Sequence, residues 1–221
     1  MTRKVVKRAP HREVGVINAA WLLNHPVEHE SHLERRFVIA ALACPVVKDI
    51  IHQPLTLSLT GGDKPERYTP DFKVVFNDGG SAIVEVKPEV FLQKHEEKLQ
   101  RAERLLRADG QRFLVITDTL IDGQALAARA LLLMRYGRLR FTDEEAMECL
   151  QTMRRVCDGN SSVKTLVAQG LSEPLVWNLV ARHECRVPVD FTVDVEQTVF
   201  ADPVEGDNHD YFKSWFGIEA R

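Results

Sequence analysis

Up to residue 137, apolar and polar positions follow two different periods. Leu33, Phe37 and Ala40 recur every three or four positions, which is typical of one buried face of a helix. The run RFLVIT over 112–117 is short, apolar and rich in branched residues, as buried strands are. The pattern predicts an α/β domain, a mixed sheet flanked by helices. The predicted elements are a helix over 28–43, strands over 46–51, 55–59, 67–76, 82–87 and 112–117, and helices over 89–108 and 124–136.

Turn residues indicate how these elements connect. The sequence Asn77-Asp78-Gly79-Gly80 separates two strands, and its glycines permit the positive φ angles of a tight hairpin turn. Another turn is expected at Gly61-Gly62-Asp63. The helix over 89–108 lies between the strands 82–87 and 112–117. In such a strand–helix–strand unit the two strands normally lie parallel, with a right-handed crossover.

Beyond Gly137 the pattern becomes mainly helical and predicts a smaller second unit over 138–200. Helices are expected over 143–157, 161–169 and 172–182, and the last two resemble a helix-turn-helix around a Gly170-Leu171 turn. The β-rich stretch 185–200 would then be the wing of a winged helix. The helix over 173–182 carries one arginine, so this unit is a weak candidate for reading DNA and an equally good candidate for docking a protein.

The two ends of the chain are predicted to lie outside these units. Residues 1–27 form a basic arm, in which the apolar stretch 14–23 favours a first short helix. Residues 201–221 form a tail with four aromatic residues, Tyr211, Phe212, Trp215 and Phe216. Such a tail either packs back onto the domain or anchors in a groove on a partner.

Composition limits the classes of protein to consider. The chain has 221 residues, 44% of them hydrophobic and 28% charged, which is typical of a globular protein. The net charge of −3 means that any contact with nucleic acid must come from local basic patches. No apolar run approaches the roughly 20 residues of a membrane span, and no secretion signal follows the basic N-terminus. Four cysteines without CxxC spacing indicate reduced thiols in a cytoplasm.

Two carboxylates and an amine are expected to converge at one end of the predicted hairpin. Asp71 lies early in the first strand, whereas Glu85 and Lys87, two residues apart, project from one face of the second. Carboxylate oxygens suit a hard ion such as Mg²⁺, and a lysine can orient a water molecule held on it. The pattern, Pro70-Asp71 followed by Glu85-x-Lys87, resembles that of PD-(D/E)xK nucleases. The alternative is a surface hairpin with a Glu–Lys pair facing solvent.

Further blocks extend this likeness along the chain. Together they resemble the TnsA endonuclease family of transposons, in the same order, over about residues 15–125. The blocks are Glu30-Ser31-x-x-Glu34-x-x-Phe37, Gln53-Pro54, Arg67-Tyr68-Thr69-Pro70-Asp71-Phe72, Glu85-Val86-Lys87-Pro88 and Val115-Ile116-Thr117.

The resemblance implies a restriction-endonuclease-like domain over 28–137, followed by a small helical, winged-helix-like C-terminal domain. Glu34, Asp71, Glu85 and Lys87 fall on the family's catalytic positions, and some members have glutamine in place of Glu85. The resemblance further implies Mg²⁺, with Mn²⁺ as a substitute. Its ligands would be Asp71, Glu85 and the carbonyl of Val86, with Glu34 acting directly or through water. Gln53 is expected to support the site structurally.

The resemblance also implies an activity and partners. TnsA proteins cut the 5′ strands at transposon ends, while a TnsB-type transposase cuts and joins the 3′ strands and a TnsC-type AAA+ ATPase binds the pair. We therefore expect double-stranded DNA and these two proteins as partners, no membrane, and a bacterial cytoplasm with the nucleoid as the location. Two alternatives stay open: a stand-alone restriction- or repair-type nuclease of the same fold, or a mainly bridging adaptor.

Three other patterns have simpler explanations. His25-Pro26-Val27-Glu28-His29 matches the inverted zinc-protease motif H-x-x-E-H, but the proline favours a loop and no third ligand is placed. Basic residues over 94–107 interleave with glutamates, which favours a solvated helix face over contact with DNA. Cys149 and Cys157 are expected to be half-buried thiols of the core.

Overall fold

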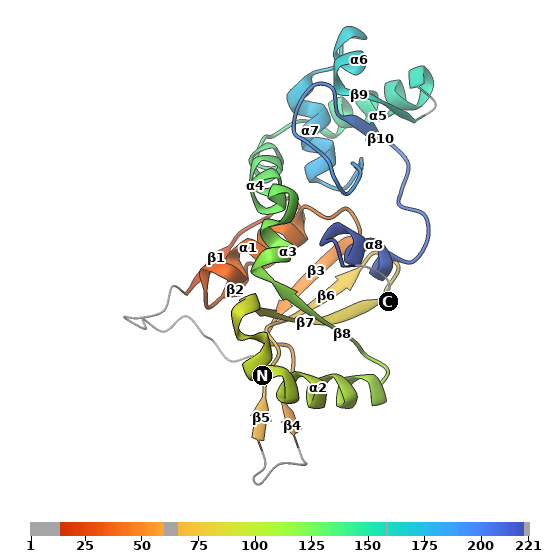
Figure 1. Cartoon of the computed structure of the whole chain (residues 1–221). Coiled ribbons are helices and arrows are strands. Elements are labelled where there is room, and N and C mark those ends of the chain that lie inside the picture. Colours follow the sequence, from red (N-terminus) through yellow and green to blue (C-terminus); the bar gives the residue numbers. More distant parts are fainter. Residues whose placement is uncertain (1–13, 60–65, 158, 219–221) are drawn as a thin grey trace.

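The computed structural model of the chain describes residues 14–59, 66–157 and 159–218. Most of the expected basic arm and the expected turn at 61–63 lie outside the described residues. Figure 1 shows an elongated molecule, in which a sheet with helices around it is joined through α4 to a second, mainly helical unit.

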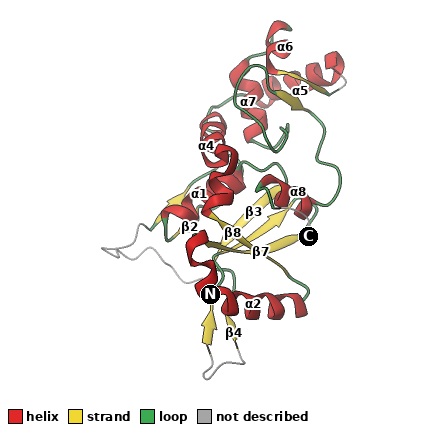
Figure 2. Ribbon diagram, in the orientation of Figure 1, coloured by secondary structure: helices red, strands yellow, loops and turns green. Residues whose placement is uncertain are grey.

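A four-stranded mixed sheet forms the centre of the first unit (Figure 2), which confirms the predicted sheet flanked by helices. The order is β3-β6-β7-β8, with the first three strands antiparallel and β8 parallel to β7. The central strand β7 is buried at five consecutive positions, and its sequence SAIVEVK is accordingly almost continuously apolar. The strands are β3 (Val47–His52), β6 (Phe72–Phe76), β7 (Ser81–Lys87) and β8 (Arg112–Thr117).

The predicted tight turn joins β6 to β7. Gly79 has a φ of 86°, and the Asp78 side chain accepts a hydrogen bond of 2.8 Å from the Gly80 N–H. The turn sets the register in which Phe72 pairs with Val84. The start of β6 therefore lies beside the end of β7.

The crossover from β7 to β8 covers one face of the sheet (Figure 1). It consists of the short helix η1 (Glu89–Phe91) and α2 (Leu92–Ala108). A hairpin of β4 (Leu57–Leu59) and β5 (Glu66–Tyr68) packs against α2 through a small hydrophobic cluster. Lys98 and Arg101 of α2 form ion pairs with Glu66 of β5, at 2.7 and 3.2 Å.

Helices α1 (His32–Leu42), α3 (Asp118–Asp122) and α4 (Leu126–Gly137) form the other layer. The rings of Phe37 on α1 and Phe72 on β6 lie 5.2 Å apart, in the main hydrophobic core. The helix predicted over 124–136 begins two residues late. Gln124 and Ala125 belong to the short helix η2 (Gly123–Ala125) and have φ angles of 50° and 56°, which breaks the path from α3 to α4.

The last helix, α8 (Asn208–Trp215), returns to the sheet of the first unit. The rings of Phe212 and Phe216 lie 5.4 Å from Phe76 and 5.6 Å from Phe37, respectively. The Trp215 indole donates a hydrogen bond of 3.0 Å to the carbonyl of Ala40. Of the two possibilities for the aromatic tail, packing back onto the domain is therefore confirmed.

The prediction of a helix over 14–23 is wrong. This segment contains the strand β1 (Gly15–Ile17), which pairs antiparallel with β2 (Val27–His29), followed by turns. The helix predicted to start at 28 starts at His32, because residues 27–29 are taken up by this pairing and the Ser31 side chain caps the helix.

The second unit confirms the two short helices around a glycine turn, with Gly170 at a φ of 91°. The prediction of a wing over 185–200 is mostly wrong. In this stretch, only β10 and a bridge between Arg186 and Phe200 form β-type pairs. Pro188 has no N–H with which to hydrogen-bond a neighbouring strand. Side chains such as that of Gln197 form hydrogen bonds with the backbone of the loop instead. The elements are α5 (Asp143–Cys157), β9 (Asn160–Ser162), α6 (Val163–Ala168), α7 (Glu173–Ala181) and β10 (Thr198–Phe200), which pairs with β9.

Candidate active site

Asp71 lies at the edge of the sheet where β7 ends. It directly precedes β6, and its Oδ2 atom accepts a hydrogen bond of 2.8 Å from the Val86 N–H. The backbone carbonyl of Asp71 accepts a second bond, 2.7 Å, from the Gln53 N–H. The aspartate is thus held from both neighbouring strands, at the end of the sheet that the hairpin pattern predicts.

Glu85 and Lys87 project from the same face of β7, because side chains alternate along a strand. Glu85 is only 4% exposed, and its Oε1 atom lies 2.8 Å from the Lys87 Nζ. Its other oxygen, Oε2, accepts a hydrogen bond of 2.7 Å from the hydroxyl of Tyr68 on β5. Glu85 is therefore buried and Lys87 is largely covered, so the alternative of a Glu–Lys pair facing solvent is wrong.

Glu34 enters the site from the first turn of α1. Its oxygens accept bonds of 2.7 Å from the Glu30 N–H and 2.9 Å from the Ser31 hydroxyl, while its own N–H donates to Ser31 Oγ. Such reciprocal bonding is a capping box, which fixes the side chain at the start of the helix. Leu33 and Phe37 on the same helix are buried, so Glu34 is held at the edge of the core, as predicted.

The electrostatics show that these carboxylates share one environment. Burial, followed by the negative charges of Glu85 and Glu34, raises the pKa of Asp71 well above its usual range. Burial is also the main cause that raises the pKa of Glu34, and Glu85 adds to it. The Lys87 ammonium opposes the shift at Asp71 but does not cancel it. Three carboxylates around one lysine leave an excess of negative charge that a divalent cation would offset.

The carboxylates are close without forming a tight cage. Within the described residues, one group of three possible metal ligands has its atoms within 4.8 Å of one another, and it is Asp207, His209 and Asp210, far from Asp71 in sequence. The hard oxygen ligands of the site match what Mg²⁺ takes, and such an ion commonly keeps several of its water molecules. The donor set therefore fits an ion that reaches part of its protein ligands through water.

Gln53 supports the site, but not as the sequence suggests. The expectation is a side-chain amide that satisfies nearby backbone. Instead, the amide donates a hydrogen bond of 3.0 Å to Glu30 Oε1, and the backbone N–H contacts Asp71. Gln53 reaches this position with a φ of 44°, so it connects Glu30, just before α1, to the aspartate.

Sequence reasoning misses two supporting residues. The capping box of Ser31 was detectable, because Ser-x-x-Glu before an apolar run is its signature. Tyr68 has no comparable local pattern, since its contact with Glu85 depends on how the β4–β5 hairpin folds back beside β7.

The zinc-type motif does not form. Val27–His29 is a strand, and His25 bonds Asp49 at 2.8 Å rather than lying beside His29 on a helix. Cys149 belongs to the core, as expected, but is fully buried rather than half-buried, and the side chain of Cys157 lies outside the described residues.

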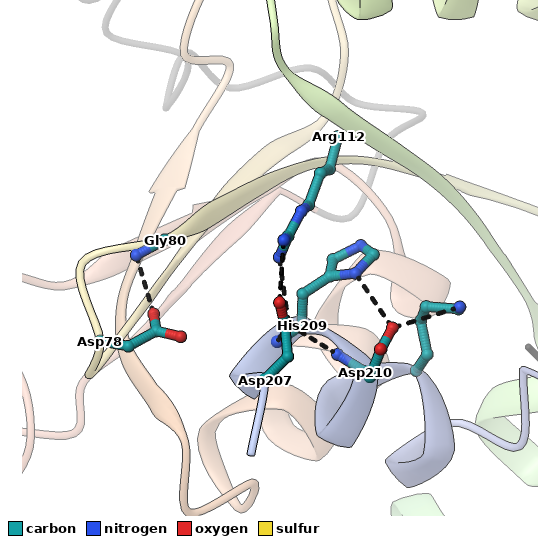
Figure 3. Close-up of polar contacts among 7 residues, drawn as sticks. Asp78, Gly80, Arg112, Asp207, His209 and Asp210 are labelled. Atoms are coloured by element: carbon teal, nitrogen blue, oxygen red, sulfur yellow. Dashed lines mark hydrogen bonds and ion pairs between the residues drawn. The ribbon is translucent and has the colours of Figure 1, made fainter.

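The group at Asp207 has a structural explanation (Figure 3). Asp207 caps α8 by accepting from the His209 N–H at 2.7 Å, and its carboxylate also binds the Arg112 guanidinium at 2.9 Å. Because Arg112 begins β8, this ion pair fastens α8 to the sheet, and both carboxylate oxygens already have partners.

Comparison with known proteins identifies a family domain in the chain. Residues 44–118 match the family model described as TnsA-like endonuclease N terminal. The matched stretch contains Asp71, Glu85 and Lys87, whereas Glu34 precedes it. No curated protein matches the chain. In the part of the chain that the structure describes, no helix combines the length and apolarity needed to cross a membrane.

Proposed function

We propose that the chain, whose residues 44–118 match a TnsA-like endonuclease domain, is a transposon-associated nuclease that cuts the 5′ strands at transposon ends in a Mg²⁺-dependent reaction. The observation that carries the proposal is the cluster of Asp71, Glu85 and Lys87 at the end of β7, with Glu34 beside it. Acidic oxygens and an amine at one sheet edge are what hydrolysis of a phosphodiester requires.

In this proposal, Asp71, Glu85 and the Val86 carbonyl hold Mg²⁺, or Mn²⁺ as a substitute, and Glu34 contributes directly or through water. When bound, the ion supplies Lewis-acid activation of water and offsets charge on the phosphate. Tyr68 keeps the Glu85 carboxylate in place through its hydroxyl. Lys87 lies 2.8 Å from Glu85 Oε1, where its ammonium group orients the attacking water and stabilises the negative charge that builds on the phosphate.

The proposed partners are double-stranded DNA at transposon ends, a TnsB-type transposase that processes the 3′ strands, and a TnsC-type ATPase. The second unit, with its two short helices around Gly170, is the proposed docking module for a protein partner. The proposed location is the bacterial cytoplasm, on the nucleoid while bound to DNA.

Mapping of strand breaks tests this function. The protein is incubated with Mg²⁺, its neighbouring transposase and end-labelled transposon DNA, and the breaks on both strands are mapped. We expect 5′-strand breaks with the wild type, none with Lys87→Ala, and normal breaks with Lys48→Ala, which removes an exposed lysine near the start of β3. Normal 5′ cutting by Lys87→Ala would refute the catalytic assignment. Cutting of plasmid by the protein alone would favour a stand-alone nuclease, and binding of both proteins without any cutting would favour an adaptor.

A further inference from the structure

A basic groove lies where the first unit joins the second, at the end of α4. We call it the arginine groove and define it by Trp21, Arg138, Arg140, Phe141 and Arg182. Its volume is about 650 Å³, and no acidic residue lines it. The chain as a whole has a net charge of −3, so the groove is a positively charged region on a protein of negative net charge.

The charge of the groove is largely uncompensated. Arg138 and Arg140 are exposed and form no ion pair within the described residues, whereas Arg182 pairs with Glu184 at 3.2 Å. Arg135, one turn earlier on α4, is exposed as well. Unpaired guanidinium groups keep all their donors for a ligand, and their planar fork fits the oxygens of a phosphate.

The groove is built on a fixed backbone. The buried side chain of Asn178 on α7 donates hydrogen bonds of 2.8 and 3.1 Å to the carbonyls of Tyr136 and Leu139. The Trp21 indole lies directly on Gly137, where any Cβ atom would collide with it. The arginines therefore project from a loop that is held in place before any ligand arrives, which reduces the entropy lost on binding.

Along the chain, α3, η2 and the whole of α4 separate the candidate active site from the groove. Thr117, which pairs with Lys87 at the active-site edge, leads into α3 and α4. At 1.5 Å per residue, α4 then spans about 18 Å before it reaches the groove. With 3.4 Å between successive base pairs, this length corresponds to about five base pairs of duplex.

We propose that the arginine groove binds the phosphate backbone of the DNA substrate, about half a helical turn or more from the scissile phosphate. The proposal rests on the proposed function, because it assumes that the substrate is duplex DNA. Arginines clustered on one face are the electrostatic footprint of a surface that binds nucleic acid. An enzyme of negative net charge needs such a patch to hold DNA, and the groove supplies it.

Salt-dependent DNA binding tests the proposal. The full chain is titrated with a labelled 40-base-pair duplex without divalent metal, over a range of salt concentrations. The variant Arg138→Gln/Arg140→Gln should bind about tenfold more weakly, and its slope of log K against log salt should be smaller by about 2, or 0.9 for each phosphate contact. The matched control is Arg154→Gln/Arg155→Gln, which removes two exposed arginines of α5 outside the groove and should behave as the wild type.

Tryptophan fluorescence gives an independent readout. Of the three tryptophans, Trp177 and Trp215 are buried, so a change in emission on DNA binding should come from the half-buried Trp21. The change should be present in the wild type and absent in Trp21→Phe.

Two outcomes would overturn the proposal. The first is an arginine variant with the affinity and salt slope of the wild type. The second is a variant that binds DNA normally but loses the neighbouring transposase, which would assign the groove to an acidic protein surface. The proposed function fails separately: a wild type that never cuts would leave the difference in salt slope between the two arginine variants intact.

Discussion

Replacement of Asp71 by asparagine should stabilise the metal-free protein and abolish cutting. The side chains have the same shape, and an asparagine Oδ1 can still accept the hydrogen bond from the Val86 N–H. What the change removes is a carboxylate whose pKa is raised by burial and by the neighbouring charges of Glu85 and Glu34. The wild type therefore gives up stability above about pH 4 to keep a carboxyl group at this position.

The sign and size of this change in the free energy of unfolding follow from proton linkage. In the unfolded chain the pKa of an aspartate is about 3.9, and in the folded protein that of Asp71 is higher. The folded state thus holds more protons between these two values. The wild-type stability should therefore fall as pH rises from about 4 to the folded pKa, and stay level above it. Each unit of the difference is worth about 1.4 kcal/mol, and we take about 1 kcal/mol as the smallest gain compatible with the argument.

Thermal and urea unfolding with and without Mg²⁺ measure the effect. Without metal, Asp71→Asn should melt at least about 2–4 °C above the wild type at pH 7.5, and the difference should shrink towards pH 4. Added Mg²⁺ at 100 times its Kd should stabilise the wild type by about 2.7 kcal/mol and the variant by much less. The reasoning is refuted if the metal-free variant is no more stable than the wild type, or if the difference does not grow with pH.

Two further predictions concern Glu34 and α8. Glu34→Gln keeps the capping box and should unfold within about 0.5 kcal/mol of the wild type in urea, whereas Glu34→Ala strands the Ser31 hydroxyl and should cost about 1–3 kcal/mol. Both should lose cutting, and normal cutting by Glu34→Gln would leave the residue a capping role only. Phe212→Ala should cost about 3–5 kcal/mol and raise hydrogen exchange in β6 and α1, whereas Met147→Ala, which truncates an exposed side chain, should not. Faster exchange confined to 143–200 would contradict the proposed packing.

The sheet could be predicted because local sequence patterns determine its strands and their connections. The Asn77–Gly80 turn fixes the register of β6 and β7, and this register alone brings Asp71 beside Val86. The parallel partner β8 followed from its short apolar run after a crossover helix, and its bounds are as predicted.

The predictions from sequence fail where the local structure depends on contacts with segments that are distant in the sequence. Residues 15–17 are a strand because Val27–His29 lies opposite them, and no local period reveals that pairing. Over 185–200, alternating apolar and polar residues suggest a strand. Pro188 and the side-chain contacts of Gln197 prevent strand pairing despite that propensity. The hydrogen bond from Tyr68 to Glu85 likewise depends on a hairpin whose position the sequence does not encode locally.

The placement of α8 has a consequence for how the enzyme is made. The ribosome synthesises the chain from its N-terminus. The rings of Phe37 and Phe76 therefore stay uncovered until residues 208–216 have been translated. A product that stops before that point leaves aromatic surface open to chaperones and proteases. The hydrophobic core beside the sheet is therefore complete only after the entire second unit has been synthesised.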